Sequence, residues 1–205
     1  MAGTMPHAIF IETDVDGNGL VAAYAAELPG CAVFAPSADD AAGAMPTRVS
    51  RFTGWLRSQG EPAPNFVGDN WYEVERAPAV AADGGRQRAA FTLDELPPSD
   101  AEFAAWMRWL ELAREDLAAA LDEGDPAAAI EVLDAIERQD VAFTRQLGGS
   151  APDLGDDPID RLYAARDGLS DALAGAGPTV DGVRRVLRLA IADDLRAAEL
   201  LRASR

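Results

Sequence analysis

The chain has 205 residues, and 35 acidic against 18 basic residues give it a formal net charge of −17 at pH 7. Every basic residue is an arginine, and there is one histidine, His7, and one cysteine, Cys31. These counts exclude a disulfide framework and a two-histidine metal site within one chain. They also argue against lysine-dependent catalysis and against binding to nucleic-acid phosphates, which needs a basic face.

The hydropathy pattern gives no sign of a membrane protein. No apolar run approaches the roughly 20 residues that a membrane-spanning helix needs. The first residues lack the basic and apolar regions of a signal peptide. We therefore expect a cytoplasmic protein without membrane contact, in which Cys31 is reduced.

Before about residue 95, short apolar runs alternate with turn residues, which is typical of strands. Four strands are predicted, at residues 7–13, 20–27, 31–35 and 70–76. A helix is predicted between the third and fourth strands, with Ser37 as its N-cap and Gly60 near its end. Pro46 interrupts this stretch, so that either it opens the main helix or the helix is kinked. The pattern predicts a small antiparallel sheet with the helix on one face.

Residues 81–98 are predicted to link two domains, residues 1–80 and residues 99–205. The connecting segment begins among small residues and ends at Pro97 and Pro98, which stop regular structure. Within it, the pattern of Arg88–Leu93 is compatible with one more short strand.

From Ser99 onwards, apolar residues recur at helical spacing. Ser99 and Glu102 have the spacing of a capping box, and further helices are predicted to begin near Pro126, near Pro158 and after Pro178. Four amphipathic helices joined by short or moderate loops predict an up-down four-helix bundle. The expected fold class is therefore α+β: a small β-β-β-α-β domain followed by an all-α four-helix bundle.

Residues 7–76 resemble the HicB-like antitoxin domain. The resemblance is carried by Ala-Ile-Phe-Ile-Glu at 8–12, the Asp- and Gly-containing loop at 14–19, Ala-Glu-Leu-Pro-Gly-Cys at 26–31 and Ser-Ala-Asp-Asp-Ala at 37–41. It implies a domain that binds and blocks a small, basic, RNA-cleaving toxin, HicA. Complete family members carry a separate DNA-binding domain after it, whereas residues 81–205 here are acidic and contain no basic recognition helix. We therefore expect partner binding without operator binding.

The second half resembles the DinB-like four-helix bundle. The resemblance is carried by Ala-Phe-Thr-Arg-Gln-Leu-Gly-Gly at 142–149, Asp-Pro-Ile-Asp-Arg-Leu at 157–162 and Val-Leu-Arg-Leu-Ala-Ile at 186–191. Active members of that superfamily bind a divalent metal with three histidines. The aligned positions here hold Ala135, Asp193 and Ala197, so the resemblance implies a bundle without a metal and without a cofactor.

Charged side chains are predicted inside this bundle. Continuation of the apolar stripes places Asp140, Arg166 and Asp193 at core-facing positions on the last three helices. Because buried charges are costly and are normally paired, one interpretation is an internal ion pair, or charged residues at a stripe edge that reaches the solvent. A polar pocket is a second, and a carboxylate site for Mg²⁺ or Mn²⁺ that includes Asp194 is a third.

Acidic residues also lie at two places in the first domain, a loop and a helix start. Asp14 and Asp16 lie in the predicted hairpin loop, and Asp39 and Asp40 lie in the first turn of the predicted helix. They are candidates to attract a basic partner protein, but the simpler explanation is that they are solvated acids of a loop and of a helix start. A calcium loop is not expected, because the twelfth position counted from Asp14 is Ala25.

These observations together predict a non-enzymatic protein-interaction protein with an antitoxin-related role and no catalytic residues. Its expected partner is a small basic protein, and a homodimer through a bundle face is a further expectation. The alternatives are a divergent DinB-like metal- or thiol-dependent transferase and a bundle that binds a small molecule.

Overall fold

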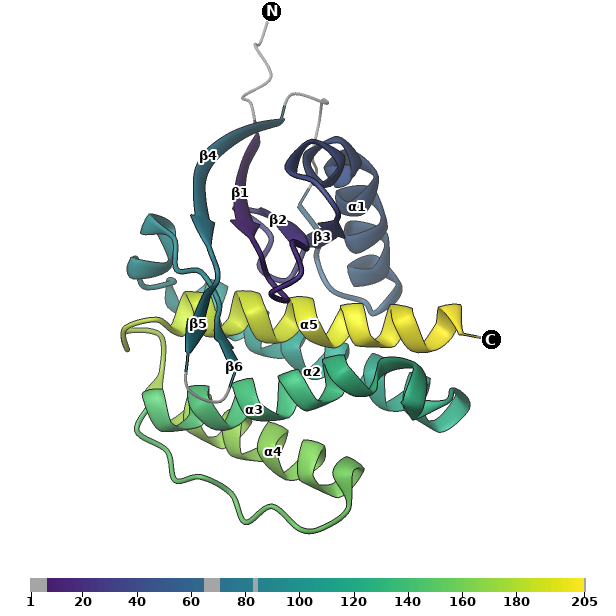
Figure 1. Ribbon diagram of the computed structural model, residues 1–205. Coiled ribbons are helices and arrows are strands. Elements are labelled where there is room, and N and C mark those ends of the chain that lie inside the picture. The colour runs from purple at the N-terminus through teal and green to yellow at the C-terminus, as the bar shows by residue number, and fades with distance from the viewer. Residues whose placement is uncertain (1–6, 65–70, 83–84, 205) are drawn as a thin grey trace, which may run out of the picture. The chain divides into compact units, whose positions relative to one another are not determined.

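A computed structural model describes residues 7–64, 71–82 and 85–204 of the chain (Figure 1). The fold is α+β, with a four-stranded mixed sheet in the N-terminal part and helices after it. The chain divides into two compact units, Met1–Leu93 and Asp94–Arg205. This boundary falls inside the predicted linker, residues 81–98.

The sheet of the first unit has the strand order β3-β2-β1-β4. Its strands are β1 (His7–Thr13), β2 (Val21–Ala25), β3 (Ala32–Ala35) and β4 (Trp71–Pro78). The pairs β1–β2 and β2–β3 are antiparallel, but β4 runs parallel to β1. The prediction of a wholly antiparallel sheet is therefore wrong. A helix separates β3 from β4 and returns the chain to the end of the sheet where β1 begins, so β4 must run in the same direction as β1.

Helix α1 (Ala38–Ser58) packs against β2 and β3. Its start is fixed by Ser37, whose side chain accepts a hydrogen bond from the backbone N–H of Asp40 at 3.1 Å. The helix runs through Pro46, so the alternative in which Pro46 opens a separate main helix is wrong. Its buried side chains include those of Met45 and Phe52.

The chain after β4 forms a small hairpin of β5 (Val80–Ala82) and β6 (Gly85–Gln87). The short strand predicted at Arg88–Leu93 is absent from the described structure. Phe91 lies there instead with 1% of its surface exposed, and its ring stacks on that of Phe10 with centroids 4.8 Å apart. Contacts between side chains, rather than strand pairing, hold this segment against the sheet.

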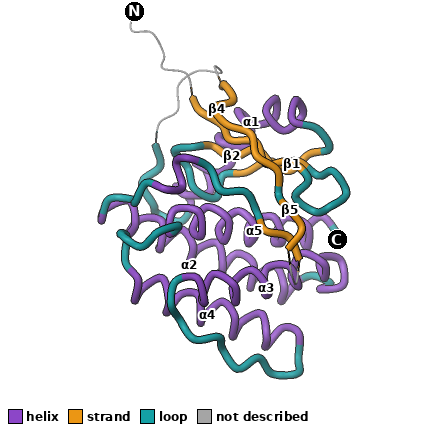
Figure 2. The backbone as a smooth tube through the Cα atoms, turned by 60° about the vertical axis from the view of Figure 1, so that its left-hand side comes forward, coloured by secondary structure: helices purple, strands orange, loops and turns teal. Residues whose placement is uncertain are grey.

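The described part of the second unit consists mainly of helices, which are purple in Figure 2. They are α2 (Asp100–Glu123), η2 (Pro126–Ala129), α3 (Ile130–Gln146), α4 (Pro158–Ala176) and α5 (Val183–Ala203). Helix α2 packs against α5, α3 packs against α4, and α3 also contacts α5. Among the described helices of the chain, none is long and apolar enough to cross a membrane.

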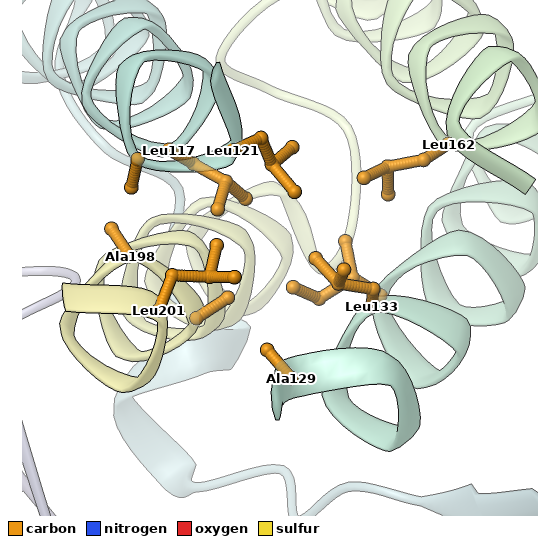
Figure 3. Packing of buried hydrophobic residues seen from close by; sticks show 10 residues of the cluster. Leu117, Leu121, Ala129, Leu133, Leu162, Ala198 and Leu201 are labelled. Atoms are coloured by element: carbon orange, nitrogen blue, oxygen red, sulfur yellow. The ribbon is translucent and has the colours of Figure 1, made fainter. Parts of the chain in front are cut away.

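These helices share one apolar core. Figure 3 shows side chains from all four helices pointing into the same space, among them those of Leu117, Leu121, Leu133, Leu162, Ala198 and Leu201. Each of the six has no more than 8% of its surface exposed. The amphipathic pattern of the sequence therefore produces a common core, because each helix buries its apolar stripe against the others.

Side-chain caps set two helix starts as the sequence predicts. At α2, Ser99 accepts from the backbone N–H of Glu102 at 3.3 Å, and the Glu102 carboxylate accepts from the backbone N–H of Ser99 at 2.8 Å. This capping box satisfies two backbone donors that the helix cannot satisfy itself. At α4, the Asp157 carboxylate accepts from the backbone N–H of Ile159 at 2.8 Å.

The residues just before α2 are tied to α5 by a buried ion pair. Asp94, in the 3₁₀ helix η1 (Thr92–Glu95), accepts from Arg188 through Nε at 3.2 Å and through Nη2 at 2.6 Å. Both side chains are about 5% exposed. This bidentate pairing gives both carboxylate oxygens a direct partner.

Candidate functional site

Besides the Asp94–Arg188 pair, a group of five charged residues lies in the interior of the helical unit, and we refer to this group as the polar cluster. They are Arg114 on α2, Asp140 on α3, Arg166 on α4, and Asp193 and Asp194 on α5. Asp140 and Asp194 are each 1% exposed, and Arg166 is 3% exposed. Charged side chains at this depth need opposite charges and hydrogen bonds close by.

Part of the polar cluster is directly paired. The Arg166 guanidinium contacts Oδ1 of Asp194. Arg114 donates through Nη1 to the backbone carbonyl of Arg166 at 2.8 Å and to the hydroxyl of Ser170. These contacts join α2 and α5 to α4 through polar groups.

The remaining contacts of Arg114 are longer. Its Nη2 lies 3.9 Å from Oδ2 of Asp140, and its Nε lies 3.8 Å from Oδ2 of Asp194. Both distances exceed that of a hydrogen bond. All four atoms are buried, and none has a hydrogen-bond partner among the residues that the structure describes. Unpaired polar atoms in a protein interior are costly, and each needs a physical explanation.

Burial shifts the ionisation of this cluster. Burial raises the pKa of Asp140, although the charges of Arg166 and Arg114 oppose the rise. Burial also lowers the pKa of Arg114, and it lowers the pKa of Arg166 to about 10. With a pKa of about 10, Arg166 therefore remains charged at pH 7 and needs its carboxylate partner.

The three predicted members of the cluster are all buried. Asp194 was predicted only as a ligand of the alternative metal site, and Arg114 was not predicted. Asp193 is 6% exposed and accepts from Gln139 Nε2 at 3.0 Å. The interior positions of Arg114 and Asp194 were predictable from the sequence. Each lies at a place where the predicted apolar stripe lacks an apolar residue for one helical turn. On α2 the gap falls between Leu110 and Leu117, and on α5 between Ala190 and Ala197.

The positions that align with the DinB-like metal ligands do not form a common site. Ala135 is exposed, whereas Asp193 and Ala197 are buried. Among the described residues, no group of three or more His, Cys, Asp or Glu side chains is placed to hold a metal ion. Inside the polar cluster, two guanidinium groups occupy the space between the carboxylates and would repel a cation.

The four acidic residues predicted to bind a partner lie on two neighbouring segments of the first unit. Asp14 and Asp16 are in the β1–β2 loop, and Asp39 and Asp40 are in the first turn of α1. The last residue of β3 pairs with the first residue of β2. The segment that leads into α1 therefore begins beside the loop that leads into β2.

Local hydrogen bonds hold these carboxylates. Asp14 has a positive φ of 56° and accepts from the backbone N–H of Gly19 at 3.1 Å. Asp16 accepts from the backbone N–H groups of Asn18 and Leu20 at 2.8 and 3.0 Å. In α1, the hydroxyl of Ser37 donates to Asp40 at 2.6 Å. Asp16, Asp39 and Asp40 are nevertheless exposed, so their charge faces the solvent.

The first unit also has a buried acid, Glu12 on β1, which was not predicted as a site. It is fully buried, and its carboxylate accepts from Tyr24 at 2.8 Å, from Arg88 Nε at 3.1 Å and from the backbone N–H of Ala89 at 2.6 Å. Burial alone would raise the pKa of Glu12, but the charge of Arg88 and these hydrogen bonds outweigh burial and leave the pKa below its usual value. Because its oxygens are well supplied with donors, Glu12 acts as an anchor of the fold.

Comparison of the chain with protein-family models, with curated proteins and with solved structures found no match.

Proposed function

We propose that this chain is a non-enzymatic protein-binding protein whose first unit binds a small basic protein. The observation that carries the proposal is the placement of Asp14, Asp16, Asp39 and Asp40 on two adjacent segments. Clustered carboxylates steer a basic partner and fix its orientation more than they add to affinity. The resemblance of residues 7–76 to the HicB-like domain supports a small basic ribonuclease of the HicA type as the partner.

The local geometry supports recognition by this surface. Hydrogen bonds to the loop and to the helix cap hold three of the carboxylates in defined positions. A surface that is ordered before binding loses less conformational entropy when the partner arrives.

The polar cluster supports a non-enzymatic interpretation. Its carboxylates face the guanidinium groups of Arg114 and Arg166, an arrangement of ion pairs and not of a nucleophile beside a base. The thiol of Cys31 belongs to the other unit and is completely buried. A divergent DinB-like transferase remains the alternative, and stoichiometric metal in elemental analysis of the purified chain would favour it.

For the second unit we propose a four-helix bundle of the DinB-like kind that has lost its metal ligands and serves as an interaction module. The common core of α2, α3, α4 and α5 supports this assignment. A homodimer through a helix face would follow from it, since cyclic dimers are the commonest oligomers. Light scattering of the purified chain distinguishes a dimer from a monomer.

Calorimetric titration of the full chain with a HicA-like toxin, made inactive as a ribonuclease, tests the proposed partner. A variant with Asp14, Asp16, Asp39 and Asp40 all changed to asparagine should bind at least about tenfold more weakly, because each lost charge removes a favourable rim interaction. Asparagine keeps the turn and capping geometry, so folding should be preserved. Circular dichroism verifies this.

The matched control changes four exposed acids of the helical unit to amides and so alters the net charge equally. These are Glu115, Asp122, Glu131 and Asp171. The control variant should bind nearly as tightly as the unchanged chain. No binding of the toxin, or equal weakening in both variants, would contradict the proposal.

A further inference from the structure

The unpaired atoms of the polar cluster form a site with both donors and acceptors. Arg114 and Arg166 each supply Nε and Nη2 as donors, and Asp140 and Asp194 each supply one carboxylate oxygen, Oδ2, as an acceptor. Nη2 of Arg114 lies 3.9 Å from Oδ2 of Asp140, and Nε lies 3.8 Å from Oδ2 of Asp194. These distances are too long for direct hydrogen bonds, but they are short enough for one water molecule to contact both atoms of a pair. Asp140 and Asp194 are each 1% exposed, so solvent at the surface does not satisfy these groups.

The chemistry of the site defines its guest. The guest must accept from a guanidinium N–H and donate to a carboxylate oxygen, because both kinds of group are unpaired. A metal cation cannot accept from the guanidinium, and an anion cannot donate to the carboxylates. The guest must also be very small, because the groups that it bridges are less than 4 Å apart.

We propose that the polar cluster is an internal hydration site, in which ordered water bridges Arg114 to Asp140 and to Asp194. Buried waters typically make about three hydrogen bonds to groups that would otherwise be unpaired. A water at this place accepts from Nε or Nη2 of Arg114 and donates to Oδ2 of the facing aspartate. It completes the coordination of carboxylates contributed by α3 and α5 and of a guanidinium contributed by α2.

A crystal structure of the full chain, at a resolution that shows ordered solvent, tests the proposal directly. The expected result is a water peak within hydrogen-bond distance of Arg114 and of one or both aspartates. Direct hydrogen bonds from Arg114 to both Asp140 and Asp194, without an intervening peak, would overturn it. So would a peak whose height and distances identify an ion.

A solution measurement keeps the proposal testable if no crystal forms. The Nε–H of Arg114 should show a cross-relaxation peak to water with the sign of a long-lived complex. The Nε–H of Arg188 is the internal control, because that buried arginine donates directly to Asp94 at 3.2 Å. The experiment is repeated in Ser170→Ala, since the Ser170 hydroxyl contacts Arg114 and could relay exchange with water.

The expected result is a water peak for Arg114 and none for Arg188, in the unchanged chain and in Ser170→Ala alike. The absence of the Arg114 peak, or its loss in Ser170→Ala, would overturn the hydration site.

Discussion

Two buried carboxylates of this chain, Glu12 and Asp140, differ in the hydrogen bonds that they accept and therefore in their pKa values. Glu12 accepts hydrogen bonds from Tyr24, Arg88 and a backbone N–H. Oδ2 of Asp140 accepts no hydrogen bond from the described residues and lies 3.9 Å from Nη2 of Arg114. The pKa of Glu12 is therefore below its usual value, and that of Asp140 is above it. Complete coordination stabilises the charge, and burial without it opposes the charge.

Replacement of Glu12 by glutamine should destabilise the chain by about 3–5 kcal/mol, because it leaves the Arg88 charge without its buried partner. The depressed pKa makes this loss depend on pH. The stabilisation by Glu12 is complete above about pH 4.5, the ordinary value for this group, and is lost as the pH falls through the lower folded-state pKa. Urea unfolding of both proteins between neutral and acidic pH should therefore give a difference that shrinks on acidification.

Glu73→Gln is the matched control. It removes a carboxylate of the same sheet that pairs with Arg76 at the surface, where solvent screens the interaction. This control should change the stability little. A loss as large as that of Glu12→Gln, or a Glu12→Gln difference that grows on acidification, would contradict the assignment of Glu12 as an anchor.

At the scale of elements, the four helices alternate in the charge that they contribute to the polar cluster. In chain order, α2 contributes Arg114, α3 contributes Asp140, α4 contributes Arg166 and α5 contributes Asp194. A rearranged packing would place some of these charges away from their partners. The cluster therefore favours one arrangement of the helices, although it adds little to stability by itself.

We therefore expect that removal of one charged partner lowers the free energy of unfolding more than removal of all four charges of the cluster. Asp194→Leu should destabilise the helical unit by about 3–5 kcal/mol, because it leaves two guanidinium groups without their shared carboxylate. The fourfold variant Arg114→Met, Asp140→Leu, Arg166→Met and Asp194→Leu should be clearly more stable than that single variant, since no uncompensated charge remains. Urea unfolding measures both.

The fourfold variant should keep the helical content but show a less cooperative transition if the charges select one packing. Circular dichroism and the slope of the unfolding curve measure these two properties. A fourfold variant that is as unstable as Asp194→Leu would show that the cluster contributes net stability and would contradict this account.

At the scale of the molecule, the features that could be predicted from the sequence are those that depend on residues close together in the chain. The strand His7–Thr13 and the helix starts at Ser37 and Ser99 follow from β-branched patterning and from side-chain caps, which act within a few residues. The direction of β4 and the Glu12–Arg88 pair were not predictable in this way. They depend on the end of the sheet to which the chain returns and on contacts between residues 76 positions apart.

The net charge of −17 belongs to the whole molecule and makes its stability depend on salt. With 35 acidic against 18 basic residues, repulsion between like charges outweighs attraction over most of the surface. Potassium chloride screens interactions between exposed charges beyond a Debye length of about 8 Å at physiological ionic strength, but it screens buried pairs such as Arg188–Asp94 much less.

The midpoint of thermal unfolding should therefore rise as potassium chloride is added to a low-salt buffer. The variant with amides at Glu115, Asp122, Glu131 and Asp171 should show a smaller rise, because four repelling charges are gone, and an equal or larger rise in that variant would contradict repulsion as the cause.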